Sequence, residues 1–198
     1  MIRIAETHAA CDVLGPGTRF VVWVQGCPLT CRDCVSPQWI PAAGGRDVPV
    51  DDLAARIAGA PVDGLTVSGG EPFAQAGAVA DLITAVRARR EMSTMAYSGF
   101  TIEHLRRRGD AGQRRLLGLL DLLVDGPYLA HRHADLRWRG SDNQRVHRLT
   151  DRHPPLADDR GAGLQFEVTA GGDMQWLGVP PVAGFRRSFE NAMGRNPR

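Results

Sequence analysis

The fold of this chain is decided by residues 20–34, which read FVVWVQGCPLTCRDC. The first five of these residues form a continuous apolar run, which is typical of a parallel β-strand covered on both faces. Directly after the run, the spacing C-x3-C-x2-C brings together Cys27, Cys31 and Cys34, three of the four cysteines. Because sites in α/β folds are built at the carboxyl ends of parallel strands, we expect this cysteine loop to be a functional site.

The clustered cysteines predict a metal centre. Three thiols at short spacing are a poor disulfide framework, because an odd number leaves one unpaired and the spacing restrains the bridging geometry. A structural zinc site normally has a fourth protein ligand, whereas an iron–sulfur cluster held by three thiolates keeps one iron open. The spacing alone does not decide between them. Cys11 lies far from the cluster in sequence, and we interpret it as a small buried or partly exposed thiol.

Composition predicts a cytoplasmic globular protein of one domain. The chain has 198 residues, of which 43% are hydrophobic and 23% charged. A formal net charge of +2 gives no case for a nucleic-acid partner. All 24 basic residues are arginine, which excludes mechanisms that need a lysine nucleophile or a Walker-type lysine. No stretch reaches the ~18 apolar residues of a membrane span and no signal pattern opens the chain, so we expect no membrane contact and reduced thiols.

Strand, loop and helix recur along the chain after the cysteine loop. The predicted strands cover residues 20–24, 65–68, 93–97, 122–124 and 145–149, and the predicted helices cover 51–58, 74–90, 101–108 and 113–120. Such βα repeats predict an α/β fold with a parallel sheet, open or barrel-like. Residues 1–19 show no strong periodicity.

The composition changes after Thr150. Residues 151–163 are rich in Pro, Asp, Arg and Gly and are typical of a linker or an ordered loop. Two apolar runs, 165–169 and 174–177, flank Gly171 and Gly172, which predicts a β-hairpin, and a short helix is predicted over 185–193. We therefore expect a core domain of residues 1–150 and a C-terminal extension of residues 151–198 packed on it.

A second motif, Gly69-Gly70-Glu71-Pro72, follows the second predicted strand. Taken alone it is typical of a tight turn with a capping carboxylate. Its functional interpretation is that two glycines let a ligand approach the backbone while Glu71 accepts hydrogen bonds from a ligand ammonium group. The cysteine motif followed by this motif resembles the radical S-adenosylmethionine (SAM) superfamily.

The resemblance is closest to the anaerobic ribonucleotide reductase activating protein and pyruvate formate-lyase activating enzyme family, and it covers residues 12–150. The supporting segments occur in that family's order: Gly15–Arg19, Ser68–Pro72, Tyr97–Phe100, Val124–Gly126 and Arg139–Arg145. It implies an incomplete (βα)6-type barrel with a small C-terminal hairpin extension. It also implies an oxidoreductase in which Cys27, Cys31 and Cys34 hold a 4Fe-4S cluster whose open iron binds SAM.

In such an enzyme, reductive cleavage of SAM would give a 5'-deoxyadenosyl radical that generates a glycyl radical on a partner protein. The resemblance implies a flavodoxin or ferredoxin-type electron donor, and no catalytic residue beyond the cluster and SAM. The candidate SAM contacts are Gly69, Gly70, Glu71, Pro72, Asp33, Tyr97, Ser98, Asp125 and Asn143. Two residues depart from the family's pattern, because Asp33 replaces a usual aromatic residue near the adenine and Pro127 replaces a lysine common in the reductase activators.

Two alternatives remain open at this point. The first is a radical SAM enzyme that acts on a small molecule or a peptide in a biosynthetic pathway, as Asp33, Pro127 and the C-terminal extension suggest. The second is a structural zinc module in which Cys11 or a histidine completes the three clustered cysteines.

Overall fold

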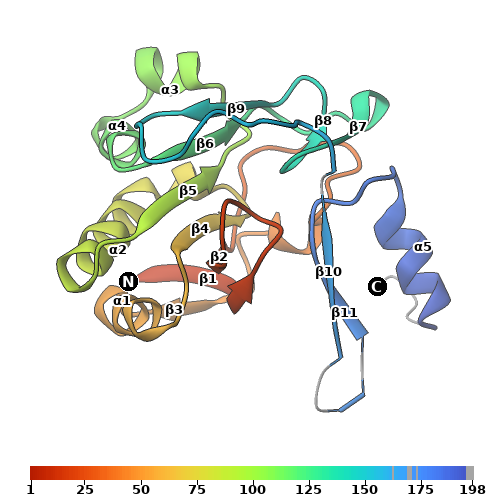
Figure 1. The fold of residues 1–198 in the computed structure, drawn as a ribbon, viewed down its shortest axis with the longest axis horizontal. Helices are drawn as coiled ribbons and strands as arrows, with labels where there is room; N and C mark the ends of the chain where they lie inside the picture. Colours follow the sequence, from red (N-terminus) through yellow and green to blue (C-terminus); the bar gives the residue numbers. More distant parts are fainter. Residues whose placement is uncertain (162, 169–170, 173, 195–198) are drawn as a thin grey trace.

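A mixed β-sheet of seven strands forms the centre of the molecule (Figure 1). The computed structural model describes residues 1–161, 163–168, 171–172 and 174–194. Along the sheet the strands follow the order β3-β1-β2-β4-β5-β6-β9. They are β1 (Ile2–Cys11), β2 (Arg19–Val24), β3 (Arg46–Val48), β4 (Gly64–Gly69), β5 (Ser93–Tyr97), β6 (Leu122–Asp125) and β9 (Arg145–Arg148). Strands β2, β4, β5 and β6 run parallel, whereas β1, β3 and β9 pair antiparallel with their neighbours.

Strand β2 is apolar throughout because both of its faces are covered. Its residues Phe20, Val22 and Val24 belong to the core between the sheet and the helices. Val21 and Trp23 point to the other face and belong to a second apolar cluster. The predicted doubly covered parallel strand is therefore confirmed.

Four α-helices pack on one face of the sheet (Figure 1). They are α1 (Val50–Gly59), α2 (Ala76–Arg89), α3 (Ile102–Arg108) and α4 (Ala111–Gly118). Helix α1 buries Leu53, Ala54 and Ile57, which recur at helical spacing. Helix α3 is capped by Thr101, whose side chain accepts a hydrogen bond from the backbone N–H of His104.

The smaller elements include two hairpins and a last helix. The 3-10 turns are η1 (Pro37–Trp39), η2 (Pro72–Gln75) and η3 (Ala130–Arg132). One hairpin pairs β7 (His133–Leu136) with β8 (Arg139–Ser141), and the other pairs β10 (Leu164–Val168) with β11 (Met174–Gly178). The last helix is α5 (Phe185–Ala192). In Figure 1, β10, β11 and α5 lie across the sheet from α1 and α2. The predicted hairpin and final helix are confirmed, while Thr169 of the predicted hairpin lies outside the described residues.

Two edges of the sheet differ from the sequence prediction. Residues 1–19, which lack strong periodicity, contain the long strand β1, whose pairing with β2 has irregularities between Ile4 and Glu6 and between His8 and Cys11. These breaks obscure the alternation of apolar and polar residues that would have revealed a strand. Strand β9 pairs antiparallel with β6, and the connection between them carries only η3 and a hairpin, without the crossover helix that usually joins parallel strands.

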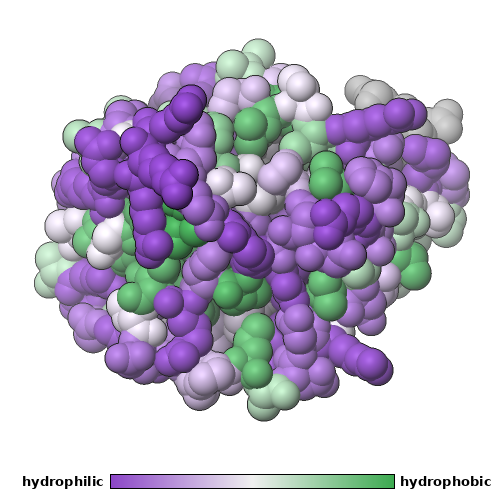
Figure 2. Space-filling view, turned by 90° about the horizontal axis from the view of Figure 1, so that it is seen from above, coloured by the Kyte–Doolittle hydropathy of each residue, from purple (hydrophilic) through white to green (hydrophobic). Residues whose placement is uncertain are grey.

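Among the described residues, no helix combines the length and apolar character that a membrane crossing requires. The face seen from above is mostly hydrophilic, with hydrophobic residues in small separate groups (Figure 2). Large hydrophobic side chains exposed in the described part of the chain are Met1, Phe166, Val168, Val182 and Met193. Four of these five lie in the C-terminal extension, so that segment has the least complete apolar core.

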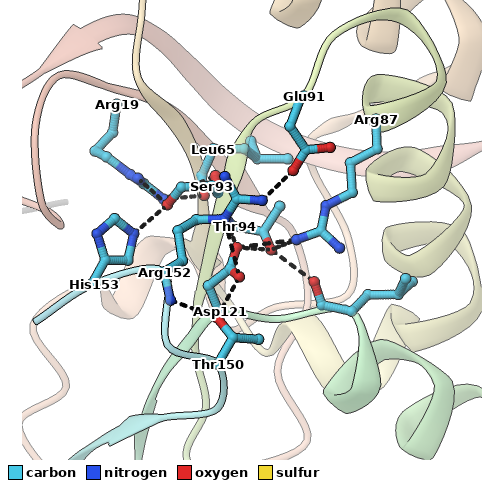
Figure 3. A network of polar contacts seen from close by, with 11 residues as sticks. Arg19, Leu65, Arg87, Glu91, Ser93, Thr94, Asp121, Thr150, Arg152 and His153 are labelled. Carbon is cyan, nitrogen blue, oxygen red and sulfur yellow. Dashed lines mark hydrogen bonds and ion pairs between the residues drawn. The ribbon is translucent and has the colours of Figure 1, made fainter.

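A buried arginine joins three strands at the end of the sheet opposite the cysteine loop (Figure 3). The Arg19 side chain is fully buried, and its guanidinium donates to Ser93 Oγ at 2.8 Å, Leu65 O at 2.7 Å and Thr66 Oγ1 at 3.1 Å. Burial lowers the pKa of Arg19 to about 10, because the charged form loses its hydration. Arg19 lies at the start of β2, and its partners lie on β4 and β5. Its hydrogen bonds therefore fix the starts of these three strands relative to one another.

Asp121 forms the second centre of this polar network (Figure 3). Its carboxylate accepts hydrogen bonds from Thr94 N at 2.9 Å, Arg87 Nη2 at 3.0 Å, Thr150 Oγ1 at 2.7 Å and Arg152 Nε at 3.3 Å. Burial opposes ionisation, but these hydrogen bonds and the two arginines outweigh it and lower the pKa of Asp121. Asp121 thereby ties Thr150 and Arg152 to β5.

Replacing Gly64 with alanine is expected to lower the free energy of unfolding by about 2 kcal/mol or more. The new Cβ would lie 1.9 Å from Arg19 Nη1 and 2.7 Å from the Ser93 carbonyl oxygen, and neither group has room to move away. Gly77→Ala in α2 is the control, because its Cβ would meet nothing within 4 Å and alanine favours a helix by ~0.5–1 kcal/mol. Urea unfolding measures both variants. Equal stability of Gly64→Ala and the wild type would contradict the prediction.

Asp121→Asn is expected to destabilise the protein by about 2–4 kcal/mol at pH 7, with a smaller deficit in acid. A carboxylate with a lowered native pKa stabilises the fold above its unfolded pKa, here 3.8, and this contribution is lost as the pH falls through the lower native value. Urea unfolding at pH 7, 5 and 3.5 measures the difference. The exposed Asp81, which pairs with Arg115, gives the control Asp81→Asn, expected to cost less than ~1 kcal/mol at each pH.

Candidate functional site

One large pocket opens at the carboxyl ends of the parallel strands. Its volume is about 980 Å³, at the upper end of the range typical of small-molecule sites. The residues that follow β2, β4, β5 and β6 all contribute to its wall, as expected for a site at this edge of the sheet. Cys27, Cys31 and Cys34 line the pocket together.

The cysteine loop is closed at its base by backbone hydrogen bonds. Gly26 N donates to Trp39 O and Cys27 N donates to Ile40 O, each at 2.9 Å. Gln25, directly after β2, adds a side-chain hydrogen bond from Nε2 to Pro41 O at 2.8 Å. The loop therefore leaves the sheet and returns to the same place, which holds its three cysteines over the pocket.

All three loop cysteines are free and partly exposed. Burial raises the pKa of Cys27 to about 11 and also raises that of Cys31, where the neighbouring Cys34 adds to the effect. In the described part of the chain, no three His, Cys, Asp or Glu side chains are grouped tightly enough to hold one metal ion. An iron–sulfur cluster suits such a loop better than zinc, because its thiolates bind separate iron atoms and need not converge on a single ion.

Cys11 is placed away from this centre. It is fully buried in the apolar cluster with Val21 and Trp23 and does not line the pocket. The interpretation of Cys11 as a small buried thiol is confirmed.

The two glycines of the second motif let two loops of the chain approach each other. A Cβ at Gly70 would lie 2.2 Å from the Gly26 carbonyl oxygen, and one at Gly69, where φ is +104°, would lie 2.4 Å from Val24 N. Gly70 N donates to Val24 O at 2.7 Å and Glu71 N donates to Gly26 O at 3.0 Å. The motif therefore supports the base of the cysteine loop, which is a structural reason for two glycines here.

Glu71 is buried and joins the loops that follow β4 and β5. Its carboxyl group accepts from Phe73 N at 2.9 Å, Ser98 Oγ at 3.0 Å and Gly99 N at 2.8 Å. Burial raises the pKa of Glu71 to about 7, although these hydrogen bonds oppose the shift. A cation that reached the pocket wall here would favour the ionised form.

Tyr97 and Ser98 end β5 at the pocket wall. The Tyr97 hydroxyl is buried and has no hydrogen-bond partner within the described residues. A buried donor without a partner costs about 1–3 kcal/mol, so this position suits a ligand acceptor or an ordered water. Together with three thiols on one loop, this unpaired hydroxyl fits a pocket that holds a cluster and a polar organic cofactor.

The other predicted contacts lie outside the pocket lining. Pro72 is buried at the start of η2, and Asp33 is exposed with a left-handed φ of 59° and a long ion pair to Arg32 at 3.8 Å. A short polar side chain tolerates this backbone conformation, which gives a local reason for aspartate here.

Asp125 and Asn143 brace the loop after β6. The buried Asp125 carboxylate accepts from Arg145 Nη2 and Ile102 N, each at 2.6 Å, and these bonds outweigh its burial and lower its pKa. Asn143 Nδ2 donates to Pro127 O at 2.8 Å. Both residues thus support Gly126, which does line the pocket.

Several pocket residues carry no sequence signal of a site. Trp23 and Trp39 lie with ring centroids 5.4 Å apart in the wall, and residues 175–179 with Arg186 come from the C-terminal extension. Every residue of β2 is buried, so its sequence pattern does not show which face of the sheet Trp23 lies on. Contacts of the extension depend on how it packs and leave no local pattern.

Gly70→Ala is expected to disturb the cysteine loop more than the fold. The new Cβ would meet the Gly26 backbone, so we expect the variant to bind well under half of the wild-type iron after anaerobic reconstitution and to lose about 2 kcal/mol of stability. Iron and sulfide analysis with thermal unfolding measures both effects. The control is Gly118→Ala, whose Cβ meets nothing within 4 Å. Wild-type iron content in Gly70→Ala would refute the proposed role of this contact.

Comparison with known proteins agrees with this geometry. The family described as "4Fe-4S single cluster domain" matches residues 13–147. The anaerobic ribonucleoside-triphosphate reductase-activating proteins of Enterobacteria phage T4 and Vibrio cholerae are 32% and 34% identical over 148 residues, which cover 71% and 70% of this chain and 91% and 92% of those proteins. The pyruvate formate-lyase 1-activating enzyme of Escherichia coli K12 is 31% identical over 128 residues, 62% of this chain and 50% of that protein. The chain belongs to the radical SAM family of 4Fe-4S single-cluster activating enzymes.

Proposed function

We propose that this chain generates a glycyl radical on an anaerobic ribonucleotide reductase. The observation that carries the proposal is the match to reductase-activating proteins over more than nine-tenths of their length. A 4Fe-4S cluster with SAM bound supplies reductive cleavage of SAM and a radical able to take a hydrogen atom from a glycine. The protein holds the reactants in place and keeps water from the pocket.

The residues take different parts in this proposal. Cys27, Cys31 and Cys34 hold the cluster, since they share one loop over the pocket. The SAM contacts nearest to them are Gly69, Gly70, Glu71, Tyr97 and Ser98, which line the same pocket. The remaining four residues act indirectly, because they shape the loops that carry these contacts: Asp33, Pro72, Asp125 and Asn143.

Further parts of the proposal concern the whole molecule. We propose that the sheet is an incomplete (βα)6-type barrel, with residues 1–150 as the core domain and 151–198 as an extension of it. The electron donor is of flavodoxin or ferredoxin type, and the exposed Arg106, Arg107 and Arg108 at the end of α3 suit an acidic partner. The cytoplasmic location stays a prediction from the reduced cysteines.

A second candidate is a radical SAM enzyme that acts on a small molecule or a peptide. The observation that favours it is the C-terminal extension, which lines the pocket but lies beyond the family match. Incubation with a glycyl-radical reductase and detection of the protein radical by electron paramagnetic resonance separates the two candidates. A radical on the reductase supports activation, and its absence with intact SAM cleavage supports the second candidate.

Cys31→Ala is expected to reduce SAM cleavage to less than about one hundredth of the wild-type rate, because the cluster loses one of its three ligands. The assay measures methionine and 5'-deoxyadenosine after anaerobic reconstitution and reduction with dithionite. Cys11→Ala is the matched control, since Cys11 is buried outside the pocket, and it should retain the activity. Full activity in Cys31→Ala would refute the ligand assignment.

A further inference from the structure

The C-terminal extension supplies one wall of the pocket that holds the three cysteines. Residues 175–179, in β11 and just after it, line the pocket, and so do Arg186, Phe189 and Glu190 of α5. The family match ends at residue 147, so this wall is built from sequence outside the shared domain. Figure 1 shows these elements on the side of the sheet opposite α1 and α2.

The hairpin of the extension is anchored to strand β1. Gln165 receives a hydrogen bond from Asp12 N at 2.9 Å and donates to Ala10 O at 3.0 Å. His8 Nε2 lies 2.8 Å from a carboxylate oxygen of Glu167. These contacts follow the length of β10 and fix the hairpin to the body of the protein.

Helix α5 has a weaker attachment. None of its residues is fully buried, and it packs on the hairpin through aromatic side chains. The ring centroids of Phe185 and Trp176 lie 5.2 Å apart, and those of Phe189 and Phe166 lie 6.2 Å apart. Because Phe166 is itself half exposed, this aromatic cluster holds α5 to the hairpin without burying it in the core.

Arg186 joins α5 directly to the cysteine loop. Its Nε donates to the carbonyl oxygen of Val35, the residue after Cys34, at 2.7 Å. Glu190 accepts from Arg186 Nη1 at 3.1 Å, and the guanidinium lies 5.2 Å from the centroid of the Trp176 ring. Glu190 and the Trp176 ring therefore both orient the guanidinium that donates to the cysteine loop.

We propose that Arg186 is a positioning residue that fixes α5 across the mouth of the pocket, so that β11 and α5 form the wall facing the hydrogen donor. This inference rests on the proposed function, since the donor is assigned there. A pocket in which a radical forms must exclude water and hold the donor close, and a wall tied to the cysteine loop does both. Losing the tie should uncouple SAM cleavage from radical transfer to the partner.

The test compares Arg186→Met and Arg186→Lys with the control Arg187→Met, which removes an exposed arginine from the same helix. Hydrogen exchange of the full chain, before cluster reconstitution, should show amides of α5 exchanging about tenfold faster in Arg186→Met, the factor expected for one lost charge-assisted hydrogen bond. The reconstituted variant should keep its iron and cleave SAM without a partner, while glycyl radical formed per SAM cleaved falls about tenfold. Arg186→Lys can still donate to Val35 O and should recover most of the coupling.

Three results would contradict different parts of the proposal. Exchange and coupling in Arg186→Met equal to those of Arg187→Met would overturn the positioning role. Loss of iron in Arg186→Met would also overturn it, because Arg186 would then support the cysteine loop itself. A wild-type protein that cleaves SAM but forms no glycyl radical would refute the proposed function, and the exchange measurement would still decide whether Arg186 holds α5.

Discussion

The functional end of this protein depends on the contact between two loop bases, where Gly70 N and Glu71 N donate to the carbonyl groups of Val24 and Gly26. These two hydrogen bonds continue the pairing of β2 with β4 beyond the last residues of the strands. A side chain at Gly70 would overlap the Gly26 backbone, so the contact requires glycine. The cysteine loop therefore takes its position from the sheet, and its three cysteines share the rigidity of the core.

Glu71 extends the same arrangement to the next strand. Its carboxyl group joins the loop after β4 to Ser98 and Gly99 after β5, and Asp125 makes an equivalent connection between β6, α3 and β9. Hydrogen bonds to buried carboxyl groups thus connect successive loops at the site end of the sheet. At the opposite end of the sheet, hydrogen bonds of the buried Arg19 and Asp121 side chains connect the starts of the strands (Figure 3).

The C-terminal extension adds a surface to this framework. It is attached by polar contacts to β1 and to the cysteine loop, and its aromatic residues remain partly exposed. Leu177 of β11 is buried in the apolar cluster with Val21 and Trp23, whereas no residue of α5 is fully buried. Helix α5 can therefore respond to a partner at lower energetic cost than the hairpin or the sheet.

The sequence by itself determined the parallel strands, the four covering helices, the cysteine loop and the family, because each depends on local spacing: apolar runs, helical periodicity and C-x3-C-x2-C. It predicted that Gly69 to Glu71, Tyr97 and Ser98 lie at the site end, since strand ends are visible in the chain. Only the tertiary structure decided that β1 and β9 run antiparallel, that Asp33, Asp125 and Asn143 lie outside the pocket lining, and that residues 175–179 and Arg186 complete its wall. These features depend on contacts between segments distant in the chain, such as Arg186 with Val35, and no periodicity of the sequence records them.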